Sequence, residues 1–149
     1  MPARARLIGI NHVALEVGDV AVALELFGRL FEFELRGRHG SMAFLDMGDQ
    51  FLALSEGRTQ EADDQRHFGL VVDDVDAVRE ALAREGIEEI PTRFATSLDF
   101  RDPWGNLFQV VSYPEIQFER TSGVQRALGI EAIEKSESAR REIAEKGLG

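Results

Sequence analysis

The chain alternates between two hydrophobic periodicities, and the order of these segments predicts its elements. Residues 8–17 are apolar, rich in β-branched side chains and loosely alternating, which predicts a strand. Residues 20–30 carry apolar side chains every three or four positions, which predicts an amphipathic helix, and Asp19 stands where its N-cap is expected. Three further short strands are expected near 31–37, 41–47 and 50–55.

The second half of the chain shows the same succession. A strand is predicted over 67–72, and Asp74 is expected to cap a helix over 75–85 that ends at Gly86. Further strands are expected near 87–90 and over 94–101 and 106–113.

This succession is an internal repeat. Shifting the sequence by 55 residues aligns 12–29 with 67–84, with seven identities in 18 positions. The identical pairs are His12/His67, Leu15/Leu70, Val17/Val72, Asp19/Asp74, Val20/Val75, Glu25/Glu80 and Arg29/Arg84. The alignment then continues with one inserted residue, which places Phe44 on Phe100. Two repeats are too few for a solenoid, so we expect two half-domains that pack together.

These elements predict one α+β domain over residues 1–149. Two βαβββ modules are expected at 7–55 and 67–113, joined by a polar linker at 56–66. Residues 114–149 lie beyond the repeat and are expected to be a mostly helical extension. Its helix is predicted over 130–146 and needs a neighbour, because its apolar stripe is thin.

Composition and charge narrow the possible functions. The chain has 17 Lys and Arg against 27 Asp and Glu, a formal net charge of −10, so nucleic acids and anionic membranes are not expected partners. Cysteine is absent, which excludes disulfides, thiolate nucleophiles and Cys-based zinc sites. Because neither a membrane span nor a signal-peptide pattern is found, we expect a cytoplasmic protein whose chemistry uses histidines, carboxylates, amides or hydroxyls.

Two of the three histidines stand at equivalent positions of the repeat. Because side chains alternate along a strand, His12 shares a face with Ala14, and His67 shares one with Gly69, opposite the more apolar faces. Small neighbours leave space, so each histidine is either a hydrogen-bonded core residue or a ligand of a shared metal site. The equivalent positions on the last strand of each half are Ala53 and Gln109.

Three segments carry a resemblance to a known family: 10–15 (INHVAL), 67–75 (HFGLVVDDV) and 102–109 (DPWGNLFQ). Together they resemble the vicinal oxygen chelate superfamily, which includes glyoxalase I, extradiol dioxygenases and bleomycin-resistance proteins. The resemblance covers about residues 7–113. It implies curved mixed sheets that enclose one cavity, and a divalent metal such as Fe, Mn, Ni or Zn. This fold hosts many reactions, so the resemblance specifies the fold more closely than the chemistry.

The family's metal positions would fall on His12, Ala53, His67 and Gln109. Ala53 has no ligand atom, and Gln109 stands where glutamate is usual, so one negative charge and a candidate general base are missing. Glyoxalase I activity is therefore not expected. Fosfomycin thiol transfer is not expected either, because 87–101 shows no obvious set of cationic and hydroxyl side chains for a phosphonate.

Two functions remain open on this reading. The first is a metal-dependent lyase, isomerase or dioxygenase acting on a small oxygen-bearing substrate, with the metal held by His12, His67 and Gln109. The alternative is a metal-free protein that sequesters a small molecule, as bleomycin-resistance proteins do. Further candidates for the cavity are Ser97, Asp99, Arg101 and Tyr113. The expected partners are a small-molecule ligand and a second copy of the chain, because exposed sheet edges need covering.

Overall fold

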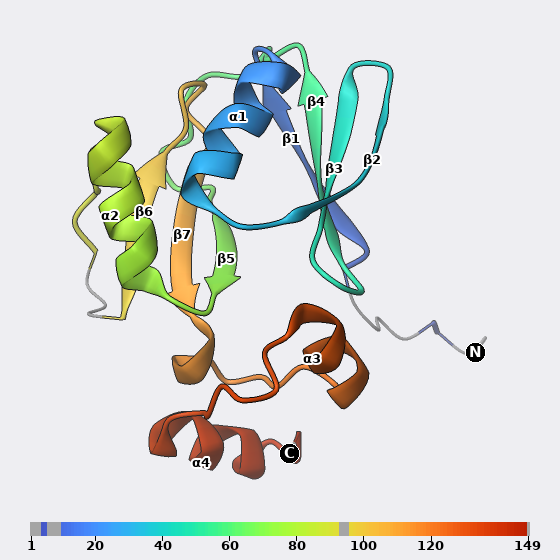
Figure 1. The fold of residues 1–149 in the computed structure, drawn as a ribbon, viewed down its shortest axis with the longest axis vertical. Helices are drawn as coiled ribbons and strands as arrows, with labels where there is room; N and C mark the ends of the chain where they lie inside the picture. The colour runs from blue at the N-terminus through green and yellow to red at the C-terminus, as the bar shows by residue number, and fades with distance from the viewer. Residues whose placement is uncertain (1–3, 6–9, 93–95, 149) are drawn as a thin grey trace.

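The chain forms two α+β modules in the computed structural model, which describes residues 4–5, 10–92 and 96–148 (Figure 1). The first module contains β1 (His12–Val17), α1 (Val20–Leu30), β2 (Glu34–His39), β3 (Met42–Asp46) and β4 (Phe51–Glu56). The second contains β5 (Phe68–Val72), α2 (Val75–Glu85), β6 (Ser97–Arg101) and β7 (Leu107–Ser112). The strand orders are β1-β4-β3-β2 and β5-β7-β6, and β1/β4 and β5/β7 are the parallel pairs. The predicted α+β class is confirmed.

The second sheet has one strand fewer than expected. In the described residues the strand predicted near 87–90 is reduced to a single bridge between Ile90 and Asp99. Pro91 follows this bridge, and proline lacks the N–H that would continue a ladder. Residues 93–95, where the next strand was expected to begin, lie outside the described residues, as do residues 8–9 of the first predicted strand.

The strand registers confirm most of the repeat and correct one part of it. Ala14 lies opposite Ala53 and Gly69 lies opposite Gln109, so Ala53 and Gln109 are equivalent, as predicted. Phe44, however, pairs with Ala53, whereas Gln109 pairs with Asp99. The counterpart of Phe44 is therefore Asp99 and not Phe100, and the inserted residue lies in the turn between β6 and β7.

Both module helices have the predicted bounds, because their ends are specified locally. The Asp19 carboxylate accepts a hydrogen bond from the Val22 N–H, and Asp74 accepts one from the Ala77 N–H. α2 ends at Gly86, whose φ of 68° lies in the left-handed region that glycine adopts without strain.

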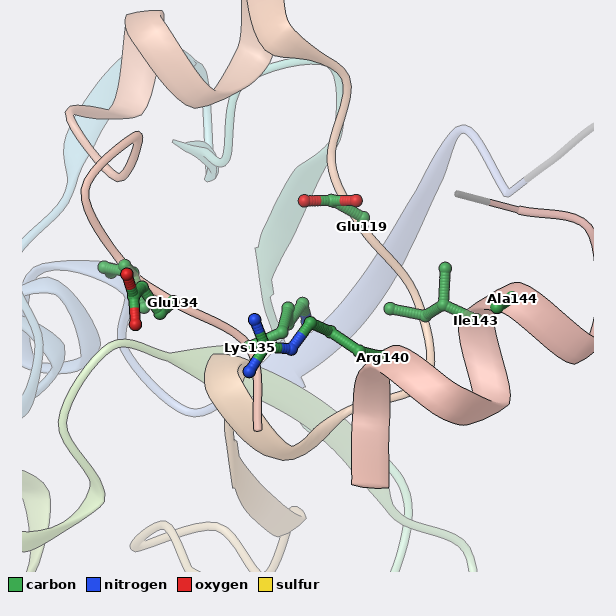
Figure 2. Close-up of a pocket in the computed structure, with 7 residues that line it drawn as sticks. Glu119, Glu134, Lys135, Arg140, Ile143 and Ala144 are labelled. Carbon is green, nitrogen blue, oxygen red and sulfur yellow. The ribbon is translucent and has the colours of Figure 1, made fainter. Parts of the chain in front are cut away.

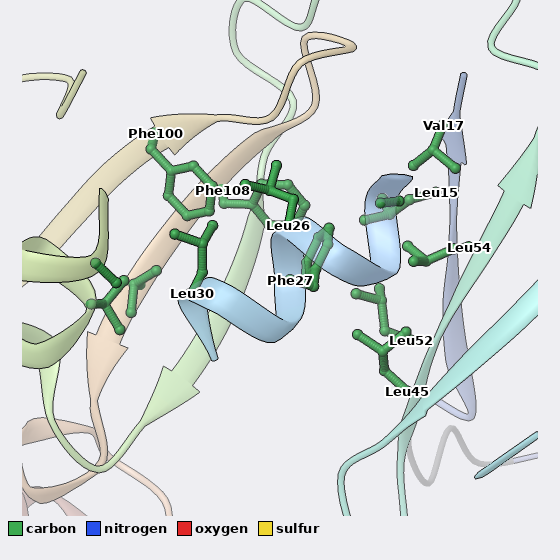
Figure 3. Packing of buried hydrophobic residues seen from close by; sticks show 14 of the residues in the cluster. Leu15, Val17, Leu26, Phe27, Leu30, Leu45, Leu52, Leu54, Phe100 and Phe108 are labelled. Atoms are coloured by element: carbon green, nitrogen blue, oxygen red, sulfur yellow. The ribbon is translucent and has the colours of Figure 1, made fainter. Parts of the chain in front are cut away.

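One hydrophobic core joins the two modules. Figure 1 shows α1 between the two sheets, and Figure 3 shows its Leu26, Phe27 and Leu30 among side chains of both. Phe27 meets Phe108 of β7 edge-to-face, with ring centroids 5.6 Å apart. Phe108 in turn stacks on Phe100 of β6 at 5.2 Å. The helix of the first module thus covers the sheet of the second, so the modules bury one shared core.

The turn between β6 and β7 forms a second joint between the modules. Asp102 accepts hydrogen bonds from the N–H groups of Trp104 and Asn106, and Asn106 Nδ2 donates to the Glu16 carbonyl of β1. Burial raises the pKa of Asp102, although these hydrogen bonds oppose the rise. Trp104 packs over Gly18, where a Cβ would overlap the indole ring.

The C-terminal extension contains two short α-helices in place of the one predicted over 130–146. Its elements are η1 (Tyr113–Glu115), α3 (Ser122–Leu128) and α4 (Glu137–Glu145). α3 ends at Gly129 in the left-handed region, and α4 starts only at Ser136, whose hydroxyl caps it. The predicted neighbour exists, because Ala139 and Ile143 of α4 are buried and α4 contacts η1. No helix in the described part of the chain is long and apolar enough to span a membrane.

Lys135 ties the segment before α4 to η1. Its Nζ donates to the carbonyls of Tyr113 (2.5 Å) and Ile116 (3.1 Å) and lies over the Tyr113 ring. Burial lowers the pKa of the Lys135 ammonium, although Glu119 and Glu115 act in the opposite direction.

Replacing Lys135 with methionine should destabilise the fold at neutral pH by about 1–3 kcal/mol, because two carbonyls lose their donor. The difference in free energy of unfolding between wild type and variant should widen as the pH rises towards about 10, the ordinary pKa range of lysine. The reason is that the native pKa is lowered, so the unfolded chain holds more protons over this interval and stability rises with pH. Urea denaturation at several pH values measures this; a difference that is independent of pH would contradict it.

Candidate functional site

The candidate site is a pocket between the two modules. β1 and β5 are each the edge strand of their sheet, and the pocket runs between their beginnings and the turn that leads into β4. Its volume is about 310 Å³. The lining residues are Ile10, Asn11, His12, Val13, Met47, Gln50, Phe51, Leu52, His67, Phe68, Gly69 and Leu70. The fold therefore brings the two repeat-equivalent histidines into one pocket, whose other walls are mostly apolar.

Both histidine rings are held through the same nitrogen. His12 Nδ1 lies 2.7 Å from the Asn11 side-chain oxygen, and His67 Nδ1 lies 2.9 Å from the Gln65 carbonyl. Both partners are oxygen acceptors, so the tautomer that suits these contacts has its proton on Nδ1 and a free lone pair on Nε2. The His12 ring also stacks on Phe51, with centroids 4.8 Å apart. This is the arrangement of metal-binding histidines, in which a hydrogen bond at one nitrogen orients the other.

The other two predicted metal positions do not line this pocket. Ala53 is buried between Ala14 and Phe44 on the neighbouring strands. Gln109 lies on β7 next to β5, opposite Gly69, and is partly exposed. No group of three His, Cys, Asp or Glu side chains in the described residues is arranged to hold a metal ion. The role of Gln109 as a third ligand therefore stays a prediction.

The remaining candidates from the sequence also lie outside the pocket. Ser97 is buried, and one carboxylate oxygen of Asp99 is buried without a hydrogen-bond partner among the residues that the structure describes. The Arg101 guanidinium donates to the Asp63 carbonyl of the linker, so it holds the joint between the modules. Tyr113 is buried and its hydroxyl accepts a hydrogen bond from the Arg120 N–H, so this hydroxyl does not line the two-histidine pocket.

Several pocket residues were not predicted. Asn11 orients His12, and a polar residue directly before a strand histidine is a signal that the sequence offers. Phe51, Met47 and Gln50 could not be assigned in this way, because they come from the turn between β3 and β4 and the following strand. From the sequence alone, an apolar residue such as Met47 is expected to lie in the hydrophobic core.

A second pocket, of about 400 Å³, lies wholly within the C-terminal extension (Figure 2). Glu119 reaches it from the segment before α3, and Arg140, Ile143 and Ala144 reach it from α4. The described residues that line it include no histidine, and they mix two carboxylates with two cationic side chains. This mixture favours no single ligand charge, so the candidate site remains the pocket with the two histidines.

Comparison with solved structures agrees with this fold. A mutant of the fosfomycin resistance protein FosX from Listeria monocytogenes, complexed with Mn(II) and 1S,2S-dihydroxypropylphosphonic acid, is 22% identical with a TM-score of 0.62, and the match covers 71% of this chain and 90% of that one. FosX from Mesorhizobium loti is 19% identical with a TM-score of 0.60, and the match covers 72% of this chain and 93% of that one. The V. Pseudocholerae mobile-metagenome protein VPC_CASS1 is 20% identical with a TM-score of 0.58, and the match covers 74% of this chain and 98% of that one.

At these identities the structural likeness concerns the fold alone. The sequence itself is more specific, because the model of the Glyoxalase/Bleomycin resistance protein/Dioxygenase superfamily matches residues 9–110. That range holds the first module, all of the second except the last two residues of β7, and both pocket histidines. The chain therefore belongs to the glyoxalase/bleomycin resistance protein/dioxygenase superfamily.

Proposed function

We propose that this protein is a metal-dependent enzyme of the lyase, isomerase or dioxygenase type, acting on a small oxygen-bearing substrate in the two-histidine pocket. The observation that supports it is the pair of imidazoles in one pocket, each fixed through Nδ1 with Nε2 left as an acceptor. Similar FosX structures contain Mn(II), which agrees with a divalent ion in this fold.

The residues present fit a divalent ion in part. His12 and His67 would bind it through Nε2, and Asn11 and the Gln65 carbonyl would keep the rings oriented. Gln109, on the strand beside β5, would be the third ligand through its amide oxygen. When bound, a divalent ion supplies Lewis acidity toward a carbonyl or enolate oxygen. The apolar walls of the pocket would exclude water from the reacting atoms.

The test is metal binding by protein purified without an affinity tag. Thermal melting with Mn²⁺, Fe²⁺, Ni²⁺ or Zn²⁺ added separately should show a rise in Tm with at least one ion, because a ligand that binds only the native state stabilises it. No shift with any ion would overturn the proposal. The result would then favour the metal-free binding protein, which is also supported by the lack of a ligand atom at Ala53 and of a carboxylate at Gln109.

Replacing Gln109 with glutamate should tighten binding of the same ion by about 1–3 kcal/mol, because a carboxylate adds a full negative charge beside the cation. Without metal the variant should be less stable than wild type, since the new charge is partly buried and lacks a partner. Isothermal titration and melting of both proteins measure the two effects. If Gln109 is remote from the ion, the affinity will not change. If the gain is seen, the His12→Ala/Gln109→Glu double variant should lose it.

We further propose that the protein acts as a homodimer. The small residues Ala14 and Gly69 are exposed on their sheet faces, and Val71, on the same face as Gly69, is 40% exposed. The edge strands β1 and β5 also have one unpaired side each. A second copy would cover these surfaces. Sedimentation at micromolar concentration should give the mass of two chains, and a monomer would contradict this proposal.

A further inference from the structure

We propose that Arg120, in the C-terminal extension, is a positioning residue that holds one wall of the two-histidine pocket in place and so sets the shape of the space beside the histidines. This residue lies outside residues 9–110, the part of the chain that matches the superfamily. The inference rests on the pocket and needs no bound metal.

The Arg120 guanidinium binds the turn between β3 and β4 at three points. It forms an ion pair with Asp49, donates to the Gln50 side-chain oxygen at 3.3 Å and approaches the Met47 carbonyl at 3.5 Å. Met47 and Gln50 both line the two-histidine pocket. One cation from the extension therefore holds two of the first-module residues that line this pocket.

Arg120 is itself held firmly. Its side chain is only 15% exposed, its N–H donates to the Tyr113 hydroxyl, and its carbonyl accepts from Gln125 Nε2. A planar guanidinium with several donors suits such a multipoint contact better than an ammonium does.

Packing of α3 supports the same turn. A Cβ added at Gly48 would lie 3.0 Å from Val124 Cγ1 and 3.5 Å from Leu128, so the helix rests directly on the turn backbone. Gly48 also has a φ of 84°, which a side chain rarely adopts. The position of the turn is thus set from the extension, and loss of Arg120 should let its pocket side move away from the histidines.

The test uses diethyl pyrocarbonate, which carbethoxylates neutral imidazoles, with mass spectrometry to give a rate for each histidine. The exposed His39, at the end of β2, serves as the internal standard. The Arg120→Met variant should raise the rates of His12 and His67 relative to His39, by less than the severalfold change expected of a buried ring, because both residues are already exposed. Arg120→Lys, which keeps the charge but loses the planar fork, should give a smaller rise. Arg79→Met is the matched control, because Arg79 pairs with Glu89 and Asp76 away from the pocket, and it should change neither rate.

The outcomes separate this inference from the proposed metal chemistry, because the reaction contains no metal. Faster modification of both pocket histidines in the Arg120 variants, at a temperature where melting shows them folded, supports the inference. Rates equal to those of wild type in both variants overturn it. A rise that also appears in Arg79→Met overturns it as well, since it would reflect general loosening. If Arg120→Met does not fold, Arg120→Lys decides the question by the same comparison.

Discussion

Replacing either His12 or His67 with alanine is expected to abolish binding of the divalent ion that stabilises the wild type. The two rings are the only imidazoles among the described residues that line the pocket, so each variant leaves one imidazole and the Gln109 amide. Two protein ligands are too few for a stable site, since bound catalytic zinc has three and structural zinc four. The loss should exceed the roughly 10–100-fold that removing an outer-shell partner of a ligand costs.

Isothermal titration with the stabilising ion measures this loss. His39→Ala is the matched control, because His39 lies at the end of β2 and does not line the pocket. Undiminished affinity in His12→Ala would show that any ion is bound elsewhere. Asn11→Ala should fall between these extremes, because it removes only the hydrogen bond that orients the His12 ring.

Phe27→Ala should destabilise the whole protein by about 3–5 kcal/mol, the usual cost of removing a buried phenyl group. Phe27 is 1% exposed and contacts Phe31 in its own module and Phe108 in the other. Its loss therefore opens a cavity in the core that both modules share, and unfolding should remain a single transition.

Urea denaturation with two probes checks this prediction. Circular dichroism reports the helices, and the fluorescence of Trp104, the one tryptophan in the sequence, reports the joint where the second module meets Gly18. The two curves should coincide in both wild type and variant, as a two-state transition requires. Separate midpoints would show that the modules unfold independently. Phe118→Ala, whose side chain is 40% exposed, is the control and should have a much smaller effect.

The sequence by itself determined the features that depend on local chemistry. The capping aspartates determine where α1 and α2 begin, and Gly86 determines where α2 ends. These groups act on backbone only a few residues away. Alternation along β1 correctly separated Leu15 and Val17, which are buried, from His12, which is exposed. The repeat then predicted two equivalent modules and the pairing of His12 with His67 in one pocket.

Tertiary structure decided what depends on partners distant in sequence. Pro91 follows the strand predicted near 87–90, which is reduced to one bridge. The register of β6 and β7 places the inserted residue of the repeat in the turn between these strands. The extension ends one helix at Gly129 and starts the next at Ser136, although helix formers run through the segment between them. Arg120 shapes the pocket from a segment 70 residues away from Gln50 along the chain. A long-range contact of this kind leaves no periodic signal in the sequence, because its energy exists only after the modules and the extension have packed together.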